Sequence, residues 1–510
     1  MANSRRSRPV DPRRGPAAPP ASARTPRAAP GVPRKASSST SCAADPVARA
    51  IAAALPAWKS LPNRAGAKGR TLRVAVGLSG GCDSMVLLDA LAECARDDRA
   101  IGLQAIHVHH GLSPNADAWA EFCRTQCARR GVPLVVHRVT VARDPGASLE
   151  AAARVARLAA LARADADVIA LAHHADDQAE TVLLQLLRGA GPKGLAGMPA
   201  CGLAPGGAAL ARPLLALARS EILASAHSRG LEWIDDESNA DTDVRRNFLR
   251  HEIAPRLAQA FPGYPGTLVR AARHQAEAAL LADELAAGDA DGAIAEDSLL
   301  GTTLSRDALA AFALQAPHRA RNLLRWFLRR HGLRAPSSAR LAAMLDQLVH
   351  AAADARVALH HDGAVLGVHR GRIGVHSAPA ARFALAWHGE SEIALPHGKL
   401  EFAPTQGEGL AAAALRGAAV TIRSRIGGER ICLVADRTAR SLKRLLHEAG
   451  IPQWQRADLP LVWCGEILAA VPGLGIAATF RSEAGAPAFE LRWHPHRAHG
   501  AARQGASDPC

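Results

Sequence analysis

The sequence of 510 residues predicts an α/β fold that opens with a doubly wound, mostly parallel sheet. Apolar runs with the β-rich composition of buried strands alternate with segments of helical spacing, and a glycine-rich turn joins the first run to a helix. Polar residues follow the ends of several runs, which is where parallel sheets bind their ligands. A helical domain and a small α+β C-terminal domain are expected after this sheet.

The first element is a strand at 72–78, followed by the turn Ser79–Gly81 and a helix at 85–91. Glycine lets backbone N–H groups approach an anion closely, and the positive N-terminal end of the helix would face that anion. An acidic residue in such a turn indicates a cation, so Asp83 is expected to hold Mg²⁺ on a nucleotide pyrophosphate. An ordinary strand-to-helix turn with Asp83 as its N-cap is the structural alternative.

The alternation continues along the chain as far as residue 187. We expect strands at 102–109, 134–139 and 168–172, and helices at 115–129, 148–164 and within 173–187. Histidines follow two of these strands, at positions 109–110 and 173–174, so chemistry is expected at the carboxyl edge of the sheet.

The segment 173–187 carries the second candidate cluster. Asp176, Asp177 and Glu180 lie in the first turns of the predicted helix, with Asp177 and Glu180 on one face. Acids near a helix N-terminus also stabilise its dipole without any further role. Three acids and two histidines at one strand end exceed that need, and the paired carboxylates suit a cation, either Mg²⁺ or an amine.

A third segment, 235–256, passes from acidic to basic within a few residues. Arg245, Arg246 and Arg250 lie on a predicted helix. They form either a solvated basic face or a set of phosphate contacts, and their spacing does not decide between the two.

The composition favours a polyanionic partner and real apolar cores. The formal net charge is +15, the pI is about 10.3, and 48% of the residues are hydrophobic. Part of this charge lies in the Pro-, Ala- and Arg-rich head, 1–48, which is expected to be disordered. An organelle transit peptide is a weaker explanation of the head, because its prolines disfavour an amphipathic helix. No apolar run reaches membrane-spanning length, and the nine scattered cysteines include no C-x-x-C pair, so a cytoplasmic protein without a membrane is expected.

Three regions are expected beyond the doubly wound domain, 70–255. Helical spacing at 265–285 and 305–350, followed by strand-like alternation at 357–375, indicates a mainly helical domain at 262–378. Trp326 and Phe327 in this region are expected to be core anchors. An α+β domain is expected at 383–495 and a disordered tail at 496–510. The α+β domain also carries a basic cluster that either contacts phosphates or is a solvated face, and it consists of Arg437, Arg440, Lys443 and Arg444.

The turn SGGCDS resembles the pyrophosphate loop of the ATP pyrophosphatases, which split ATP into AMP and pyrophosphate while adenylating a substrate. Further motifs follow in order: IHVHHGLS, SLEAAARVARL, HHADDQAET, RGAGPKGLAGM, ARPLL, and DESN with RRNFLR. With IRSRIGGERICLV and the segment RSLKRLLHEAGIPQWQRADLPLVWCGEILAAVPGLGI, they resemble the tRNA(Ile)-lysidine synthetase family. Leu158 departs from the family's A-R-x-x-R-Y stretch, which carries tyrosine, and the family does not require the long head.

This resemblance implies a two-step ligation that uses ATP, Mg²⁺, L-lysine and the tRNA(Ile) with a CAU anticodon. The C2 oxygen of the wobble cytidine attacks the α-phosphate, and the lysine ε-amine then displaces AMP to give lysidine. The resemblance implies catalytic roles for Asp83, Asp177, Glu180 and Arg246, lysine binding by Asp177 and Glu180, and tRNA binding by Arg250 and the C-terminal basic cluster. The nucleotide-binding residues it implies are Ser79, Gly80, Gly81, Cys82, Asp83, Ser84 and His110.

Two other functions stay open at this point. One is another adenylating tRNA-modifying enzyme, such as a thiolase, although the absence of a C-x-x-C pair disfavours it. The other is a catalytically silent tRNA-binding protein, which the intact loop with Asp83 disfavours. A homodimer is left open.

Overall fold

The computed structural model describes residues 45–61, 71–141, 149–297, 300–351, 357–377, 382–396, 398–435 and 437–495. The described chain forms two compact units, which divide between Ala276 and Glu277. The expected tail, 496–510, and most of the expected head lie outside the described residues.

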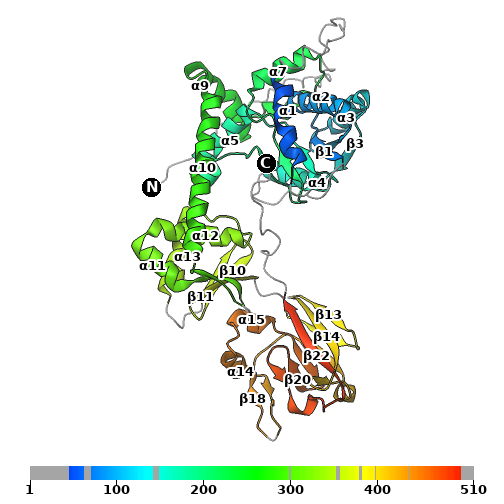
Figure 1. The fold of residues 1–510 in the computed structure, drawn as a ribbon, viewed down its shortest axis with the longest axis vertical. Helices are drawn as coiled ribbons and strands as arrows, with labels where there is room; N and C mark the ends of the chain where they lie inside the picture. Colours follow the sequence, from blue (N-terminus) through cyan, green and yellow to red (C-terminus); the bar gives the residue numbers. More distant parts are fainter. Residues whose placement is uncertain are drawn as a thin grey trace, which may run out of the picture. The chain divides into compact units, whose positions relative to one another are not determined.

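The first unit contains a six-stranded sheet in the order β3-β2-β1-β4-β6-β5 (Figure 1). All its neighbouring strands are parallel except β5 and β6. The predicted doubly wound, mostly parallel sheet is therefore confirmed. Its strands are β1 (Leu72–Gly77), β2 (Ile101–His109), β3 (Leu134–Arg138), β4 (Val168–Ala170), β5 (Cys201–Leu203) and β6 (Ala209–Ala211).

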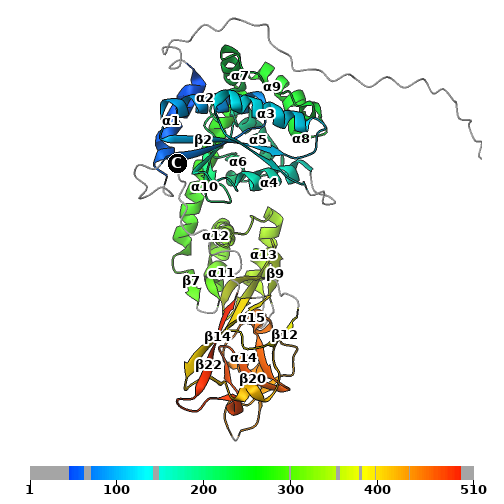
Figure 2. The same ribbon diagram turned by 90° about the vertical axis from the view of Figure 1, so that its right-hand side faces the viewer.

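Helices cover both faces of this sheet because alternate strand residues point to opposite sides. Leu72, Val74 and Val76 of β1 pack with α1, α2, α3 and α7, whereas Ala75 packs with α4. Figure 2 shows α2 and α3 on one side of the sheet and α4 on the other. The helices are α1 (Pro46–Lys59), α2 (Cys82–Asp97), α3 (Ala116–Arg130), α4 (Leu149–Leu161), α5 (Ala175–Leu187), α6 (Pro192–Leu195), α7 (Arg219–Ser228), α8 (Arg245–Phe248) and α9 (Ala254–Ala260).

Helix α1 corrects the expected boundary of the head, because ordered structure begins before residue 48. Asp45 accepts a hydrogen bond from Val47 N, and Pro46 occupies the first helical position, which is a strong helix-start signal. Asp45 also accepts hydrogen bonds from Arg229, the C-cap of α7. The helix buries Val47, Ile51 and Trp58 in the core of the first unit.

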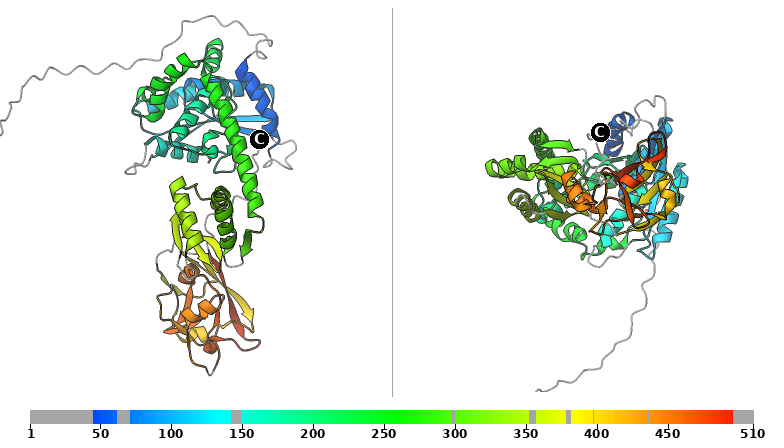
Figure 3. Two further views of the ribbon diagram at one scale, coloured as in Figure 1. Left: turned by 90° about the vertical axis from the view of Figure 1, so that its left-hand side faces the viewer. Right: turned by 90° about the horizontal axis from the view of Figure 1, so that it is seen from below.

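The chain reverses its direction of winding between β1 and β4, the two central strands. The loop after β1 and the histidines after β4 therefore meet at the carboxyl edge of the sheet, at the point where doubly wound folds bind ligands. The long helix α10 (Tyr264–Ala290) begins in this unit (Figure 3).

The second unit contains more β structure than the sequence predicts, because the region expected to be mainly helical also contains a five-stranded antiparallel sheet in the order β7-β8-β11-β10-β9. One of the helices of this region, α12, packs into the core through an apolar stripe. On this stripe Leu323, Leu324 and Phe327 are fully buried, while Trp326 is half-buried. The elements are α11 (Arg306–Gln315), α12 (Pro317–Arg330), α13 (Ser338–His350), β7 (Ile294–Asp297), β8 (Gly301–Ser305), β9 (Ala358–His361), β10 (Ala364–His369) and β11 (Arg372–Ser377).

The C-terminal module has two antiparallel sheets, β12-β16-β19-β20-β21 and β13-β14-β22-β15, over a shared core. The main strands are β12 (Ala384–Trp387), β13 (Glu392–Leu395), β14 (Gly398–Gln406), β15 (Leu410–Ala411), β16 (Val420–Arg423), β19 (Leu461–Cys464), β20 (Ile467–Val471), β21 (Gly475–Ile476) and β22 (Pro487–Pro495). A short ribbon precedes two helices, and these elements are β17 (Arg430–Ile431), β18 (Arg440–Ser441), α14 (Leu442–Glu448) and α15 (Gln453–Asp458).

Candidate active site

The turn between β1 and α2 is held in shape by its own serine side chains. The hydroxyl of Ser84 accepts hydrogen bonds from the backbone N–H groups of Ser79 and Gly80, each at 3.2 Å, and donates one to the carbonyl of Gly81 at 2.9 Å. Gly80 has a φ of +90°, and a Cβ there would lie 2.7 Å from the side chain of Ile234. Glycine is therefore required at this position for both conformation and space.

The N-terminus of α2 is open to an anion. Gly81 is its N-cap, and no side chain caps the helix there, so the amides of its first turn remain available to a ligand. Burial raises the pKa of the Cys82 thiol to about 12, with the charge of Asp83 as a second cause. Cys82 is thus a neutral thiol that contributes its backbone to this site.

Asp83 lies in the first turn of α2, and its two carboxylate oxygens have different surroundings. Oδ2 is 3.6 Å from Nε2 of His174, whereas Oδ1 is buried without a hydrogen-bond partner among the described residues. A buried carboxylate oxygen without a partner is costly, and a hard cation would satisfy it. Within the described ranges, however, no three His, Cys, Asp or Glu side chains are grouped so that they alone could hold a metal ion.

His174 joins Asp83 to helix α5. It is the N-cap of that helix. Its ring Nδ1 accepts a hydrogen bond from the backbone N–H of Asp177 at 3.4 Å, and its backbone N–H donates to the Asp177 carboxylate at 3.2 Å. Burial, the largest single effect, lowers the pKa of His174, but the surrounding carboxylates of Asp83, Asp177 and Asp176 outweigh it and raise the pKa overall. The predicted second cluster therefore touches the phosphate loop directly.

Asp177 and Glu180, the two carboxylates that the family resemblance assigns to lysine, both accept hydrogen bonds from arginines. Arg246 donates from Nε to Glu180 at 2.6 Å and from Nη2 to Asp177 at 3.1 Å. Arg250 donates from Nε to Glu180 at 2.7 Å and from Nη2 to Asp177 at 3.2 Å. We call these four side chains the carboxylate–arginine cluster, which holds two negative and two positive charges.

The cluster is mostly buried, with side-chain exposures of 7% for Glu180, 13% for Asp177, 20% for Arg246 and 25% for Arg250. Burial tends to raise the pKa of Asp177, but the positive charges of His174, Arg246 and Arg250 outweigh it and lower the pKa overall. Both carboxylates are held in place by the two arginines.

The arginines reach this position through an irregular helical segment. Helix α8 continues into a π-helical turn, Leu249–Ile253, and then into α9. Such turns are rare and are often found at functional sites. Arg250, which the family resemblance assigns to tRNA, lies in this turn and within the carboxylate–arginine cluster.

The two other histidines at the sheet edge are kept neutral. Burial lowers the pKa of His173 to about 3 and also lowers that of His110. The Nδ1 atoms of both rings are buried without a hydrogen-bond partner among the described residues. His110, expected near the nucleotide, follows β2 directly at the carboxyl edge.

Sequence reasoning misses two residues beside this site. The backbone N–H of Arg219 donates to Asp176 at 2.8 Å and ties α7 to α5. Tyr264 lies near enough to Asp176 and Glu180 for their charges, after burial as the larger cause, to raise its pKa. It is the sole tyrosine of the chain, which is the one signal that could have drawn attention to it.

The basic cluster of the C-terminal module is partly neutralised within the second unit. Arg440 and Arg444 both form ion pairs with Glu448, at 2.7 and 3.0 Å. Lys443 lies on α14 between them in sequence, and Arg437 precedes β18. Among the described residues, no helix combines the length and hydrophobicity that a membrane span requires.

Three family descriptions match the chain. Residues 59–257 match the PP-loop domain, residues 308–373 the TilS substrate binding domain, and residues 420–493 the TilS substrate C-terminal domain.

Curated relatives match most of the chain. The tRNA(Ile)-lysidine synthase of Nitrosomonas europaea is 42% identical over 430 residues, which cover 83% of this chain and 92% of the relative. That of Chromobacterium violaceum is 43% identical over 428 residues, which cover 83% of this chain and 95% of the relative. A solved structure of the U34-tRNA thiolase NcsA from Methanococcus maripaludis is 21% identical with a TM-score of 0.38, covering 47% of this chain and 81% of that chain.

Proposed function

This chain belongs to the tRNA(Ile)-lysidine synthase family, and on that premise we infer that it is an enzyme that uses ATP to form lysidine on tRNA(Ile). The observation that carries this inference is the joining of a phosphate loop to a carboxylate cluster through His174. The relatives' shared name favours this reaction over that of a thiolase. We expect the enzyme to act in the cytoplasm on the tRNA with a CAU anticodon.

The phosphate loop would hold the pyrophosphate part of ATP. The amides of the first turn of α2, which include that of Ser84, offer donors to the phosphate oxygens together with the hydroxyl of Ser79, at the positive end of a 16-residue helix. The hydroxyl of Ser84 keeps the loop in shape. Asp83 would hold Mg²⁺, because its buried Oδ1 has no partner among the described residues. When bound, the metal would neutralise charge that builds up on the leaving pyrophosphate.

In the first step, the C2 oxygen of the wobble cytidine forms a bond to the α-phosphorus while the bond to the pyrophosphate oxygen breaks. The charge that moves onto the pyrophosphate is stabilised by donors that are already oriented toward it. Arg250 feels the charge of Asp83, so it lies within electrostatic range of the phosphate loop.

For the second step, the carboxylate–arginine cluster explains how a lysine ammonium is admitted. With both arginines in place the cluster is neutral overall and attracts an ammonium weakly. We propose that bound ATP draws Arg250 toward the phosphates, which leaves a net negative charge on Asp177 and Glu180 for the lysine ε-ammonium. Arg246 keeps both carboxylates oriented through its own two hydrogen bonds.

The lysine nitrogen then bonds to C2 of the adenylated cytidine, and AMP leaves with the former C2 oxygen. The nitrogen must lose its proton in this step, and one of the two carboxylates accepts it.

The proposed function is tested by pyrophosphate release from ATP, measured with and without L-lysine and the CAU-anticodon tRNA. We expect release to require the tRNA, and lysidine to form only when lysine is also present. The same tRNA with its wobble cytidine changed to uridine is the matched control. Release that is independent of this tRNA would contradict the proposal.

A further inference from the structure

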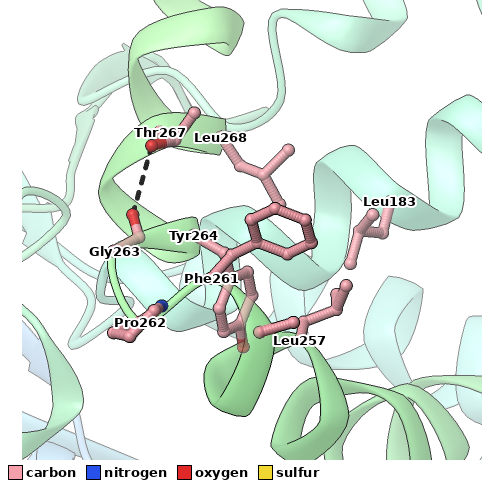
Figure 4. Close-up of a pocket in the computed structure, with 9 residues that line it drawn as sticks. Leu183, Leu257, Phe261, Pro262, Gly263, Tyr264, Thr267 and Leu268 are labelled. Carbon is pink, nitrogen blue, oxygen red and sulfur yellow. Dashed lines mark hydrogen bonds between the residues drawn. The ribbon is translucent and has the colours of Figure 1, made fainter.

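An apolar pocket lies one helical turn beyond the carboxylate–arginine cluster. Its volume is about 500 Å³, and it is formed by α5, α9, the connecting residues 261–263 and the start of α10 (Figure 4). Leu183 of its lining is three residues after Glu180 on α5, which corresponds to a rise of about 4.5 Å along the helix. A group in this pocket would therefore be a neighbour of a group in the active site.

Two aromatic side chains belong to the lining. Phe261 is 64% exposed, although a phenyl ring gains little from water contact, and Tyr264 follows three residues later. The side chains of Leu183, Leu257 and Leu268 gather beside these two residues (Figure 4). The hydroxyl of Tyr264 feels the charges of Asp176 and Glu180, so this residue connects the pocket to the cluster.

A cation lies at the edge of the pocket. Thr267, another lining residue, donates to the carbonyl of Gly263 at 3.2 Å and accepts from Nη2 of Arg270 at 3.1 Å. The exposed guanidinium of Arg270 therefore contacts one of the residues that line the pocket. Aromatic faces with a neighbouring cation are what single-stranded nucleic acid requires, because the base stacks and its phosphate is neutralised.

We propose that this pocket binds the unstacked adenine that follows the wobble cytidine in the CAU anticodon, with its ring against Phe261 and its phosphate near Arg270. The proposal rests on the proposed function, since it takes tRNA as the substrate. A cytidine can enter the cleft at the sheet edge only after it leaves its stack, and its neighbour then loses a stacking partner. The ring of Phe261 would replace the lost stacking partner. None of the side chains that line the pocket is charged, which suits an uncharged base.

The sole tyrosine makes a direct test of occupancy practicable. The full-length protein grown with 3-fluorotyrosine will have one ¹⁹F resonance, from position 264. We expect an anticodon stem-loop carrying CAU to shift this resonance, and the same stem-loop with an abasic site in place of the adenine to shift it much less. Equal shifts from both RNAs would overturn the proposal.

Substitutions at Phe261 test the stacking contribution separately. Phe261→Leu keeps an apolar side chain but loses the aromatic face, and we expect it to raise the KM for tRNA by roughly 5- to 100-fold while the KM for ATP stays the same. Phe261→Trp should restore the KM for tRNA. Leu314→Ala, which trims an 86% exposed leucine in the second unit, is the control and should change neither value.

The oligomeric state of Phe261→Leu, measured by sedimentation, tests the main competing occupant. If this change dissociates a dimer of the wild-type chain without altering the KM for tRNA, the pocket is covered by a second copy and the proposal is wrong. Pyrophosphate release by the wild type is measured in parallel. If pyrophosphate release by the wild type depends on tRNA and Phe261→Leu leaves the KM for tRNA unchanged, only the base-pocket proposal is wrong. If release by the wild type does not depend on tRNA, the proposed function is wrong.

Discussion

Arg246 donates a 2.6 Å hydrogen bond from Nε to Oε2 of Glu180, a residue 66 positions earlier in the chain. Its Nη2 reaches Asp177 as well, so one guanidinium orders both carboxylates of the helix that faces the phosphate loop. The site is thus built from two segments that are far apart in sequence, and each depends on the other for its charge balance.

Removal of one partner from this buried arrangement should destabilise the fold. Arg246→Gln leaves two mostly buried carboxylates opposite a single arginine, and we expect a loss of about 3–5 kcal/mol of unfolding free energy. Arg246→Gln with Glu180→Gln should lose less than the sum of the single changes, which a double-mutant cycle in urea measures. The exposed Arg492–Glu490 pair is the control and should show no coupling. Additive effects for Arg246 and Glu180 would mean that their contact contributes nothing.

The loop assignment predicts a specific defect for Asp83→Asn. The amide keeps the size of the side chain but binds a cation poorly, so turnover should fall roughly 10²-fold or more while the melting temperature stays near that of the wild type. A magnesium titration of pyrophosphate release checks this. Wild-type turnover with unchanged metal dependence would show that Asp83 does not hold the metal.

Local features of the active site follow from the sequence, whereas its long-range contacts do not. The turn with Gly80 and Asp83 is readable because its strand, glycines and helix start are contiguous. The pairing of Glu180 with Arg246 depends on where α8 packs, which no spacing rule gives. For the same reason, the contact of Arg250 with Glu180 could not be predicted, and the assignment of Arg250 to tRNA stays a prediction from the family resemblance.

The same limit explains the differences in the fold. The strands β1 and β2 are predicted well because their apolar runs are largely buried, as parallel strands require. Helix α1 is missed because its start signal, Asp45–Pro46, follows a long head of similar composition. The sheet β7-β8-β11-β10-β9 is not predicted in full because its strands are short and partly exposed, and β7 and β8 lie between longer helices.

The lowered pKa of His173 predicts a dependence of stability on acid. Its folded pKa, about 3, is below the unfolded value of 6.5, so below pH 6.5 the unfolded chain binds the proton first and stability is lost as the pH falls toward 3. Between pH 6.5 and pH 5 the unfolding free energy should fall by up to ~2 kcal/mol on account of His173. His173→Asn should lose less stability over that interval in urea unfolding, and His350→Asn, an exposed control, should follow the wild type. Identical slopes for all three proteins would contradict the assignment.

Glu448 should weaken the binding of tRNA by the C-terminal basic cluster. It neutralises Arg440 and Arg444, so Glu448→Ala should free two guanidiniums for tRNA phosphates. We expect tighter tRNA binding and a salt dependence whose slope is steeper by ~0.7–0.9 for each additional phosphate that is neutralised, measured by filter binding over a salt series. Glu490→Ala, in the same module, is the control. Unchanged affinity and slope would indicate that this cluster is a solvated face.

The central claim is that Asp83 serves the nucleotide while Asp177 and Glu180 serve the lysine. The direct measurement is a single-turnover reaction of the Asp177→Asn, Glu180→Gln double variant with ATP, the CAU-anticodon tRNA and L-lysine, sampled for pyrophosphate, adenylated tRNA and lysidine. The amides still accept hydrogen bonds from Arg246 and Arg250, so a thermal melt beside the reaction confirms that the variant is folded. We predict that pyrophosphate and adenylated tRNA form, that lysidine does not, and that very high lysine restores part of the product. If adenylation itself fails in the folded variant and lysine never rescues turnover, the two carboxylates belong to the nucleotide site and this division of roles is wrong.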